Sequence, residues 1–373
     1  MSTTTDLATA AAAEVSSVLS GMLAGNHEQV VHFYDPSTGL KAIVAIHNTH
    51  LGPALGGTRM WNYRSEAEAL TDVLRLSRGM SYKAAITGLN LGGGKAVIIG
   101  DAKTQKSEAM LRRFGKFVDG LGGRYITAED VNISTRDIEY MAMETKHVTG
   151  LPEILGGGGD PSPVTAYGVY LGMKASAKEA FGNDSLQGKK VLVQGVGKVG
   201  QSLVEYLGKE GAKVFVYDIS AENLKAAAVK NPAIQVVEAE GMFDLDIDIY
   251  APCALGATVN TESLSRLRCA IISGAANNQL ADEDLHGQLC KDKGILYAPD
   301  FLINAGGLIN VSIELEGYNR ERAMSKTERI YDAALNVFAI AREENIPTIQ
   351  AAKRLAEQRI ESVGRIRLSH SIR

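Results

Sequence analysis

Apolar residues follow two different spacings along this chain, and both occur in its first third. Short runs rich in β-branched residues alternate with longer segments in which apolar residues recur every three or four positions. Ser65 precedes one helical segment, and Glu68 follows three residues later, at the position of a capping box. The pattern predicts strands at 39–47, 95–99 and 124–127, helices at 65–79 and 107–121, and a helix near 10–22 behind an Ala/Ser/Thr-rich tail.

Beyond residue 163 the pattern becomes strand, turn and helix in repeated succession. This alternation is typical of a parallel sheet with helices on its faces. A segment with four glycines and two prolines, Leu155–Pro163, separates the two patterns, and we place a hinge between two domains there. The predicted strands are 190–194, 213–217, 247–250, 270–273 and 295–297, and from Glu321 the chain is predicted helical to near its end, with a break around 345–347.

Composition narrows the classes of function. The 373 residues suffice for two domains with separate cores, and the net charge of -4 gives no reason to expect a nucleic acid or an anionic membrane as partner. No apolar run reaches the length of a membrane span, and the N-terminus lacks the features of a secretion signal. The three cysteines have no CxxC spacing, which favours a reduced, cytoplasmic location.

Several kinds of catalytic centre are disfavoured. The seven histidines show no metal-ligand spacing, so we expect no metal, and we expect His47 and His50 at the exposed end of a strand. There is no G-x-S-x-G motif, and Cys253 is interpreted as a small packed residue rather than a nucleophile.

A buried strand at 191–194 leads directly into a G-x-G-x-x-G sequence, with a predicted helix behind it at 201–209. The first glycine permits a tight turn, the second lets a pyrophosphate approach the backbone, and the third lets helix and strand pack. Asp218 ends the next strand, where a carboxylate accepts hydrogen bonds from ribose hydroxyls and repels a 2′-phosphate. The alternative is an Asp that faces solvent. The pattern predicts an NAD site with Gly195, Val196, Gly197, Lys198, Val199, Gly200 and Asp218.

A second group of motifs lies before the hinge. Gly92-Gly93-Gly94 precedes Lys95, without the earlier glycine and the Ser/Thr of a Walker loop. Three glycines ahead of a strand instead suggest close approach by another group, which would leave Lys95 poorly solvated and able to act as a base. The alternatives are a solvated surface charge for Lys95 and, for Asp130, the N-cap of a helix at 133–141.

Five motifs together resemble the glutamate/leucine/phenylalanine/valine dehydrogenase family, with its leucine branch the most similar. They occur in the family's order and cover nearly the whole chain from about Gln29. The motifs are Gly-Pro-Ala-Leu-Gly-Gly-Thr-Arg-Met at 52–60, Gly-Gly-Gly-Lys at 92–95, Arg-Tyr-Ile-Thr-Ala-Glu-Asp at 124–130, Ala-Pro-Cys-Ala-Leu-Gly at 251–256 and Asn-Ala-Gly-Gly at 304–307.

The resemblance implies an α/β fold of two domains with the active site in the cleft between them. Residues 1–150 plus 347–373 would form the catalytic, substrate-binding and oligomerisation domain, and 151–346 the Rossmann-type NAD domain. Lys95 would activate water, Asp130 would shuttle protons to and from the amine, and Lys83 would bind the substrate carboxylate. The side-chain pocket would contain Leu55, Ala128, Leu308 and Val311, and Gly56 would also bind the substrate. The nicotinamide would contact Thr165, Asn277 and Asn304, and further cofactor-binding residues would be Cys253, Ala254 and Ala275.

The implied activity is NAD-dependent oxidative deamination of a branched-chain L-amino acid, leucine first, to its 2-oxo acid and ammonia, by a homo-oligomer. A phenylalanine dehydrogenase is disfavoured by Ala128, where aromatic-specific members are expected to have Gly, and a glutamate dehydrogenase by Leu55, where a Lys is expected. A non-catalytic NAD-binding regulator is disfavoured because Lys83, Lys95 and Asp130 are all present. Three features depart from the family: Val-Asn-Ile-Ser follows Asp130 where Val-Gly-Thr is expected, Leu308 is bulkier than the expected Val, and four glycines are inserted before Asp160, at the predicted hinge.

Overall fold

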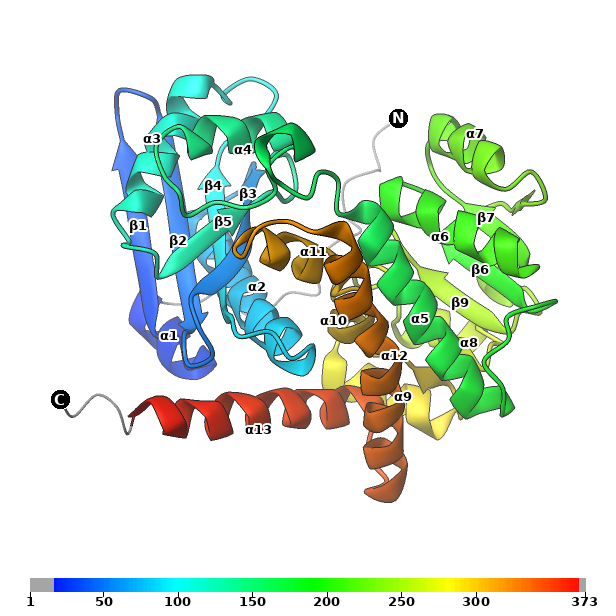
Figure 1. The fold of residues 1–373 in the computed structure, drawn as a ribbon. Coiled ribbons are helices and arrows are strands. Elements are labelled where there is room, and N and C mark those ends of the chain that lie inside the picture. Colours follow the sequence, from blue (N-terminus) through cyan, green and yellow to red (C-terminus); the bar gives the residue numbers. More distant parts are fainter. Residues whose placement is uncertain (1–16, 369–373) are drawn as a thin grey trace. The chain divides into compact units, whose positions relative to one another are not determined.

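The structure is a computed structural model that describes residues 17–368 (Figure 1). The described chain divides into two compact units. The first unit contains residues 17–161, 308–320 and 356–368, and the second unit contains residues 162–307 and 321–355.

The first unit is built on a five-stranded mixed sheet in the order β1-β2-β4-β3-β5. β2 is antiparallel to β1 and β4, whereas β3 is parallel to β4 and β5. The strands are β1 (Gln29–Asp35), β2 (Leu40–Asn48), β3 (Ala54–Trp61), β4 (Gly92–Ile99) and β5 (Tyr125–Ala128), and the helices are α1 (Val18–Gly25), α2 (Glu66–Ile86), α3 (Glu108–Asp119) and α4 (Thr135–Ala142).

The sequence of strand β2 is a nearly continuous run of apolar residues. Side chains alternate between the two faces of a strand, and here both faces are covered. Ala42, Val44 and Ile46 lie in a core with residues of α3 and α4, such as Phe114 and Met141. Ile43 and Ala45 lie in a second core with residues of α2.

The second unit contains a six-stranded, all-parallel sheet in the order β11-β10-β9-β6-β7-β8. Strand order changes direction beside β6, which is where open α/β sheets bind ligands. The strands are β6 (Lys190–Gln194), β7 (Lys213–Tyr217), β8 (Gln235–Val236), β9 (Ile249–Pro252), β10 (Ile271–Ile272) and β11 (Leu296–Tyr297), and the helices are α5 (Ser162–Phe181), α6 (Lys198–Glu210), α7 (Ala221–Lys230), α8 (Thr261–Arg266), α9 (Glu283–Asp292) and α10 (Asp300–Ile303).

Three helices close the chain: α11 (Gly306–Glu314), α12 (Arg320–Glu343) and α13 (Thr348–Leu368). The break predicted around 345–347 separates α12 from α13. Short 3₁₀ turns occupy Glu153–Leu155 and Met242–Asp244. Within the described residues, no helix is long and apolar enough to cross a membrane.

The structure corrects the predicted elements at several points. The helix expected at 65–79 continues to Ile86, and β1 and β3 were not predicted as strands. Ser65 caps α2 as predicted, since its hydroxyl accepts from the N–H of Glu68, and the Glu68 carboxylate accepts from the N–H of Arg64. Residues 10–16 of the predicted N-terminal helix lie outside the described residues.

The prediction for His47 was wrong, because this side chain is buried. Its Nδ1 lies 2.8 Å from the hydroxyl of Ser81 on α2, and burial lowers the pKa of His47 to about 3. His50 is exposed, as expected.

The unit boundaries also differ from the predicted domains: residues 308–320 belong to the first unit, and the division near the C-terminus lies between Leu355 and Ala356 rather than at 347.

Candidate functional site

Gly93, two residues before Lys95, allows α2 to pack closely against β4. A Cβ built on Gly93 would lie 2.1 Å from the backbone nitrogen of Ser81, so no larger residue fits there. The group that approaches Gly93 is therefore a helix of the same unit, whereas a Cβ on Gly94 would meet the ring of Tyr125 on β5. Lys95 follows Gly93 by two residues, and Lys83, which is half-buried, follows Ser81 by two. The contact thus fixes the elements that carry two of the predicted site residues.

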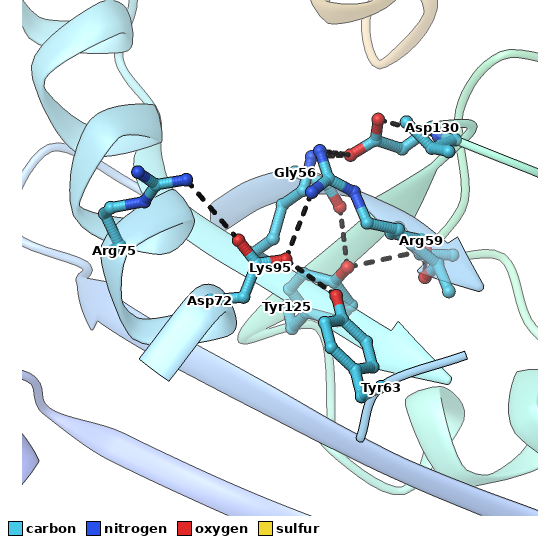
Figure 2. Close-up of polar contacts among 11 residues, drawn as sticks. Gly56, Arg59, Tyr63, Asp72, Arg75, Lys95, Tyr125 and Asp130 are labelled. Atoms are coloured by element: carbon cyan, nitrogen blue, oxygen red, sulfur yellow. Dashed lines mark hydrogen bonds and ion pairs between the residues drawn. The ribbon is translucent and has the colours of Figure 1, made fainter. Parts of the chain in front are cut away.

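Lys95 and Asp130 form an ion pair, which brings the two predicted catalytic residues together (Figure 2). The side chain of Lys95 is 9% exposed and that of Asp130 is 18% exposed. Lys95 is therefore not a solvated surface charge. Asp130 is not a helix N-cap either, because Ser134 caps α4.

The turn after Asp130 is well formed despite the departure from the family sequence. The N–H of Ile133 donates to the carbonyl of Asp130 at 2.9 Å. Asn132 has φ +61°, a left-handed conformation that Asn adopts more readily than most residues, and its side-chain amide donates to the carbonyl of Met60. The asparagine therefore does here what a glycine would do by its conformational freedom.

Charge around Asp130 favours its ionised form. Burial by itself raises the pKa of this carboxyl, but Lys95 and Arg59 outweigh burial and lower the pKa to about 2. The N–H of Val131 also donates to Oδ1 at 2.7 Å. Asp130 is therefore a carboxylate at neutral pH while Lys95 faces it.

Three residues of this cluster were missed by the sequence reasoning: Arg59, Tyr63 and Asp72. Figure 2 shows the Arg59 guanidinium between two carboxylates, with Nη1 3.0 Å from Asp72 and Nη2 3.7 Å from Asp130. The Tyr63 hydroxyl donates to Asp72 at 2.6 Å. Arg59 lies in the motif at 52–60 and could have been considered, whereas Asp72 is one of many charged helix residues.

The uncharged residues predicted to bind the substrate all lie in the first unit and are buried. Leu55 and Gly56 are on β3, Ala128 ends β5, and Leu308 and Val311 are on α11. A Cβ on Gly56 would lie 1.8 Å from the carbonyl oxygen of Gly94, so this glycine is required for strand packing.

Glu314 connects α11 to the segment around Gly150, which pairs with β5. Its carboxylate accepts from the N–H of Gly150 at 2.8 Å and of Gly158 at 2.9 Å. Gly150 follows Thr149, whose N–H donates to the carbonyl of Thr127 on β5. Burial raises the pKa of Glu314. The helix with Leu308 and Val311 is thus connected to the strand with Ala128 through defined hydrogen bonds.

In the second unit, the three fingerprint glycines occupy the environments that a dinucleotide requires. Gly195 has φ +94° and leaves no room for a Cβ beside Ala254, and a Cβ on Gly200 would lie 2.2 Å from the Gly195 carbonyl. At Gly197, in contrast, no atom of the described residues lies within 4 Å of a Cβ position. Gly197 is the N-cap of α6, and Lys198 and Val199 form its first turn, so a pyrophosphate fits this helix end.

Asp218 lies next to this turn. Its Oδ2 accepts from the N–H of Val196 and its Oδ1 from the N–H of Ser220, both at 2.8 Å. The side-chain amide of Asn223 lies 3.3 Å from both oxygens. The carboxylate is half-buried and held at the Gly-rich turn rather than pointing freely into solvent.

The other residues predicted to bind the cofactor lie close together around the carboxyl ends of β6, β9 and β10. The Asn304 amide donates to the carbonyl of Ala275 and to the side chain of Asn277, and the N–H of Ala275 lies 3.4 Å from the Cys253 sulfur. Thr165 lies beside Gly306, two residues after Asn304. Among the described residues, nothing bonds to the buried Oδ1 of Asn304, which leaves an acceptor for an amide such as a carboxamide.

Two further observations bear on the chemistry. Burial raises the pKa of the Cys253 thiol to about 12, which keeps it protonated. Among the described residues there is no cluster of three or more His, Cys, Asp or Glu that could hold a metal ion.

Comparison with known proteins identifies the family of this chain. Residues 27–147 match the family model described as Glu/Leu/Phe/Val dehydrogenase, dimerisation domain, and residues 156–221 and 216–365 match Glutamate/Leucine/Phenylalanine/Valine dehydrogenase. The chain belongs to this family. It is therefore an amino-acid dehydrogenase, an oxidoreductase that uses a nicotinamide dinucleotide and small-molecule substrates.

Individual relatives carry different names. The chain is 56% identical to leucine dehydrogenase of Thermoactinomyces intermedius, with 92% of this chain and 93% of that protein covered. It is 49% identical to phenylalanine dehydrogenase of Bacillus thermotolerans, with coverage of 91% and 90%. The structure of L-tryptophan dehydrogenase from Nostoc punctiforme superposes with a TM-score of 0.81 at 45% identity, with 93% and 99% covered. These relatives are named for three amino acids, so the side-chain pocket must decide the substrate.

Proposed function

We propose that this enzyme catalyses the NAD-dependent oxidative deamination of branched-chain L-amino acids, with leucine as its best substrate, and the reverse reductive amination. The observation that carries the proposal is the buried Lys95–Asp130 ion pair in the same unit as the four apolar residues assigned to the side-chain pocket. The first unit would bind the amino acid and the second the dinucleotide.

The assigned pocket excludes charged side chains for an energetic reason. Leu55, Ala128, Leu308 and Val311 supply no cation. A side-chain carboxylate of glutamate or aspartate would lose its hydration without gaining a partner, which costs several kcal/mol. Lys83 would bind the α-carboxylate. Leucine, isoleucine and valine should all react, since one methylene in an apolar pocket is worth about 1–3 kcal/mol.

Gly195–Gly200 and Asp218 would hold the adenosine and pyrophosphate of the cofactor, with Cys253, Ala254 and Ala275 as further cofactor contacts. Thr165, Asn277 and Asn304 would line its nicotinamide, which accepts a hydride from the substrate Cα. NAD rather than NADP is proposed because the Asp218 carboxylate would repel a 2′-phosphate. No Arg follows in Ile219-Ser220 to bind one.

Lys95 and Asp130 would divide the proton transfers between them. Loss of hydride leaves an iminium at the substrate Cα. Lys95, in its neutral form, takes a proton from the water that attacks this carbon. Asp130, which took a proton from the substrate ammonium before the hydride was lost, returns this proton to the nitrogen, and as ammonia leaves it accepts the hydroxyl proton that the new carbonyl loses. The ion pair in the structure places these two proton-transfer groups in direct contact.

A substrate panel tests the proposal. L-Leucine, isoleucine, valine, phenylalanine, tryptophan and glutamate are assayed with NAD⁺ and NADP⁺ by the formation of reduced dinucleotide, with the 2-oxo acid and ammonia measured as products. Highest kcat/KM for leucine with NAD⁺ supports the proposal. A preference for glutamate or for an aromatic amino acid contradicts the pocket assignment, and a preference for NADP⁺ contradicts the role of Asp218.

We also propose a homo-oligomeric, cytoplasmic enzyme. All three cysteines are unpaired thiols, as is usual in a reducing compartment. Residues 27–147 match a model named for dimerisation, which supports self-association. Sedimentation of the purified enzyme measures the number of subunits.

A further inference from the structure

Beside the ion pair of Lys95 and Asp130 lies a second charge cluster. Arg59 on β3 connects the two: its Nη2 lies 3.7 Å from Asp130 and its Nη1 3.0 Å from Asp72. The Arg59 side chain is 22% exposed and the Asp72 side chain 16%. Arg59 therefore joins the candidate proton-transfer group to a carboxylate on α2 (Figure 2).

The position of Arg59 is determined by its neighbours. The Asp72 carboxylate also accepts from the Tyr63 hydroxyl at 2.6 Å, and the two acceptor contacts share the same oxygen, Oδ2. A planar guanidinium held at one edge presents its other nitrogen in a fixed direction. Here that direction is toward Asp130. Arg75 also contacts Asp72, at 3.7 Å, but it is 55% exposed and is not among the cations that lower the pKa of Asp130.

The charged and titratable groups that face Asp130 come from several elements. Lys95 lies on β4, Arg59 on β3, Tyr63 on the segment after β3, and Tyr125 on β5. Asp72 on α2 faces it through Arg59. Lys95 and Arg59 thus face Asp130, and Asp72 faces Arg59, so the loss of any one of these charges changes the electrostatic field at Asp130.

We propose that Arg59, clamped by Asp72 and Tyr63, is a positioning residue for proton transfer: it orients the Asp130 carboxylate toward Lys95 and balances its charge during turnover. This inference rests on the proposed function of Lys95 and Asp130. Arg59 does not itself touch the reacting atoms. It acts on the direction and the acidity of the group that does.

The test measures kcat/KM against pH in variants that change one charge at a time. Arg59→Met removes a cation beside Asp130 and so raises the pKa of that carboxyl. The acidic limb of the profile, where activity increases with pH, should therefore move to higher pH by about one unit. Asp72→Asn removes an anion and should move the limb in the opposite direction. Arg59→Lys keeps the charge but not the two-sided contact, so the limb should stay while kcat falls. Arg75→Met, the matched control, removes a cation that contacts Asp72 but not Asp130 and should leave the profile unchanged.

A merely structural role would lower activity without moving the limb. The inference is overturned if Arg59→Met and Asp72→Asn shift the limb in the same direction or not at all, or if Arg75→Met shifts it equally. If Arg59→Met does not fold, Asp72→Asn still decides the inference, which is overturned if its limb stays in place or moves to higher pH. An inactive native enzyme in the substrate panel would instead refute the proposed function, so the two failures are distinct.

Discussion

Replacing Lys95 by alanine removes the closer of the two cations that face Asp130, and it should affect catalysis and stability to different extents. If Lys95 is the general base, kcat should fall by on the order of 10²–10⁴. Binding of NAD⁺ should change little, because the fingerprint glycines lie in the other unit. Turnover is followed by formation of reduced dinucleotide, and the NAD⁺ dissociation constant by calorimetry.

The stability effect follows from the pKa of Asp130. A decrease from 3.8 to about 2 corresponds to roughly 2 kcal/mol of folding free energy. Because the folded pKa is the lower one, this stabilisation is present above about pH 4 and is lost as the pH falls through 2. Arg59 remains in Lys95→Ala, so the variant should lose part of this free energy at neutral pH, and it should lose less than the native enzyme on acidification.

A control with the same type of contact separates the two effects. Lys106 pairs with Asp137, whose side chain is 9% exposed, at 2.6 Å in the same unit. Lys106→Ala should lower the free energy of unfolding, measured with urea, while kcat stays near the native value. Near-native turnover in Lys95→Ala, or an equal loss in both variants, would refute the assignment of Lys95 as the base.

Three further substitutions test the cofactor and substrate assignments. Asp218→Ala should raise the KM for NAD⁺ by about tenfold, because a hydrogen bond to a charged group contributes about 1.5–3 kcal/mol, and it should reduce discrimination against NADP⁺; an unchanged cofactor ratio would contradict the ribose contact. Leu55→Lys places an ammonium where the native side chain is 1% exposed, so kcat/KM for leucine should fall by more than tenfold. Ala128→Gly should raise kcat/KM for phenylalanine relative to leucine by roughly tenfold, and an unchanged ratio would mean that Ala128 does not limit the pocket.

The features predictable from sequence were those encoded by residues near one another in the chain. The strands 190–194 and 213–217, the glycine turn between them and the adjacent Asp218 follow from one continuous segment. Lys95 and Asp130 were also predicted, since each lies in a short motif. Their roles in catalysis stay predictions.

What could not be predicted depends on packing between distant elements. Asp72 meets Arg59 because α2 packs beside β3, and nothing in the sequence around Asp72 marks it as different from other helix carboxylates. His47 was placed at an exposed strand end, but β2 is covered on both faces. The return of residues 308–320 to the first unit has no local signal, because the preceding and following segments belong to the second.

This discontinuity has a consequence for synthesis on the ribosome. Leu51 and Ala85 are buried against Ala356 and Ile360 of α13, and Arg359 donates to the carbonyls of Gly88 and Leu89 just beyond α2. Roughly 270 residues separate Ala85 from Ala356, and at about 5–20 residues per second their translation takes roughly 14–54 s. During that time the sheet of the first unit can form, but the apolar surface around Leu51 and the carbonyls beyond α2 remain in contact with water or with chaperones. The first unit therefore begins to fold early and completes its core only when nearly the whole chain has been made.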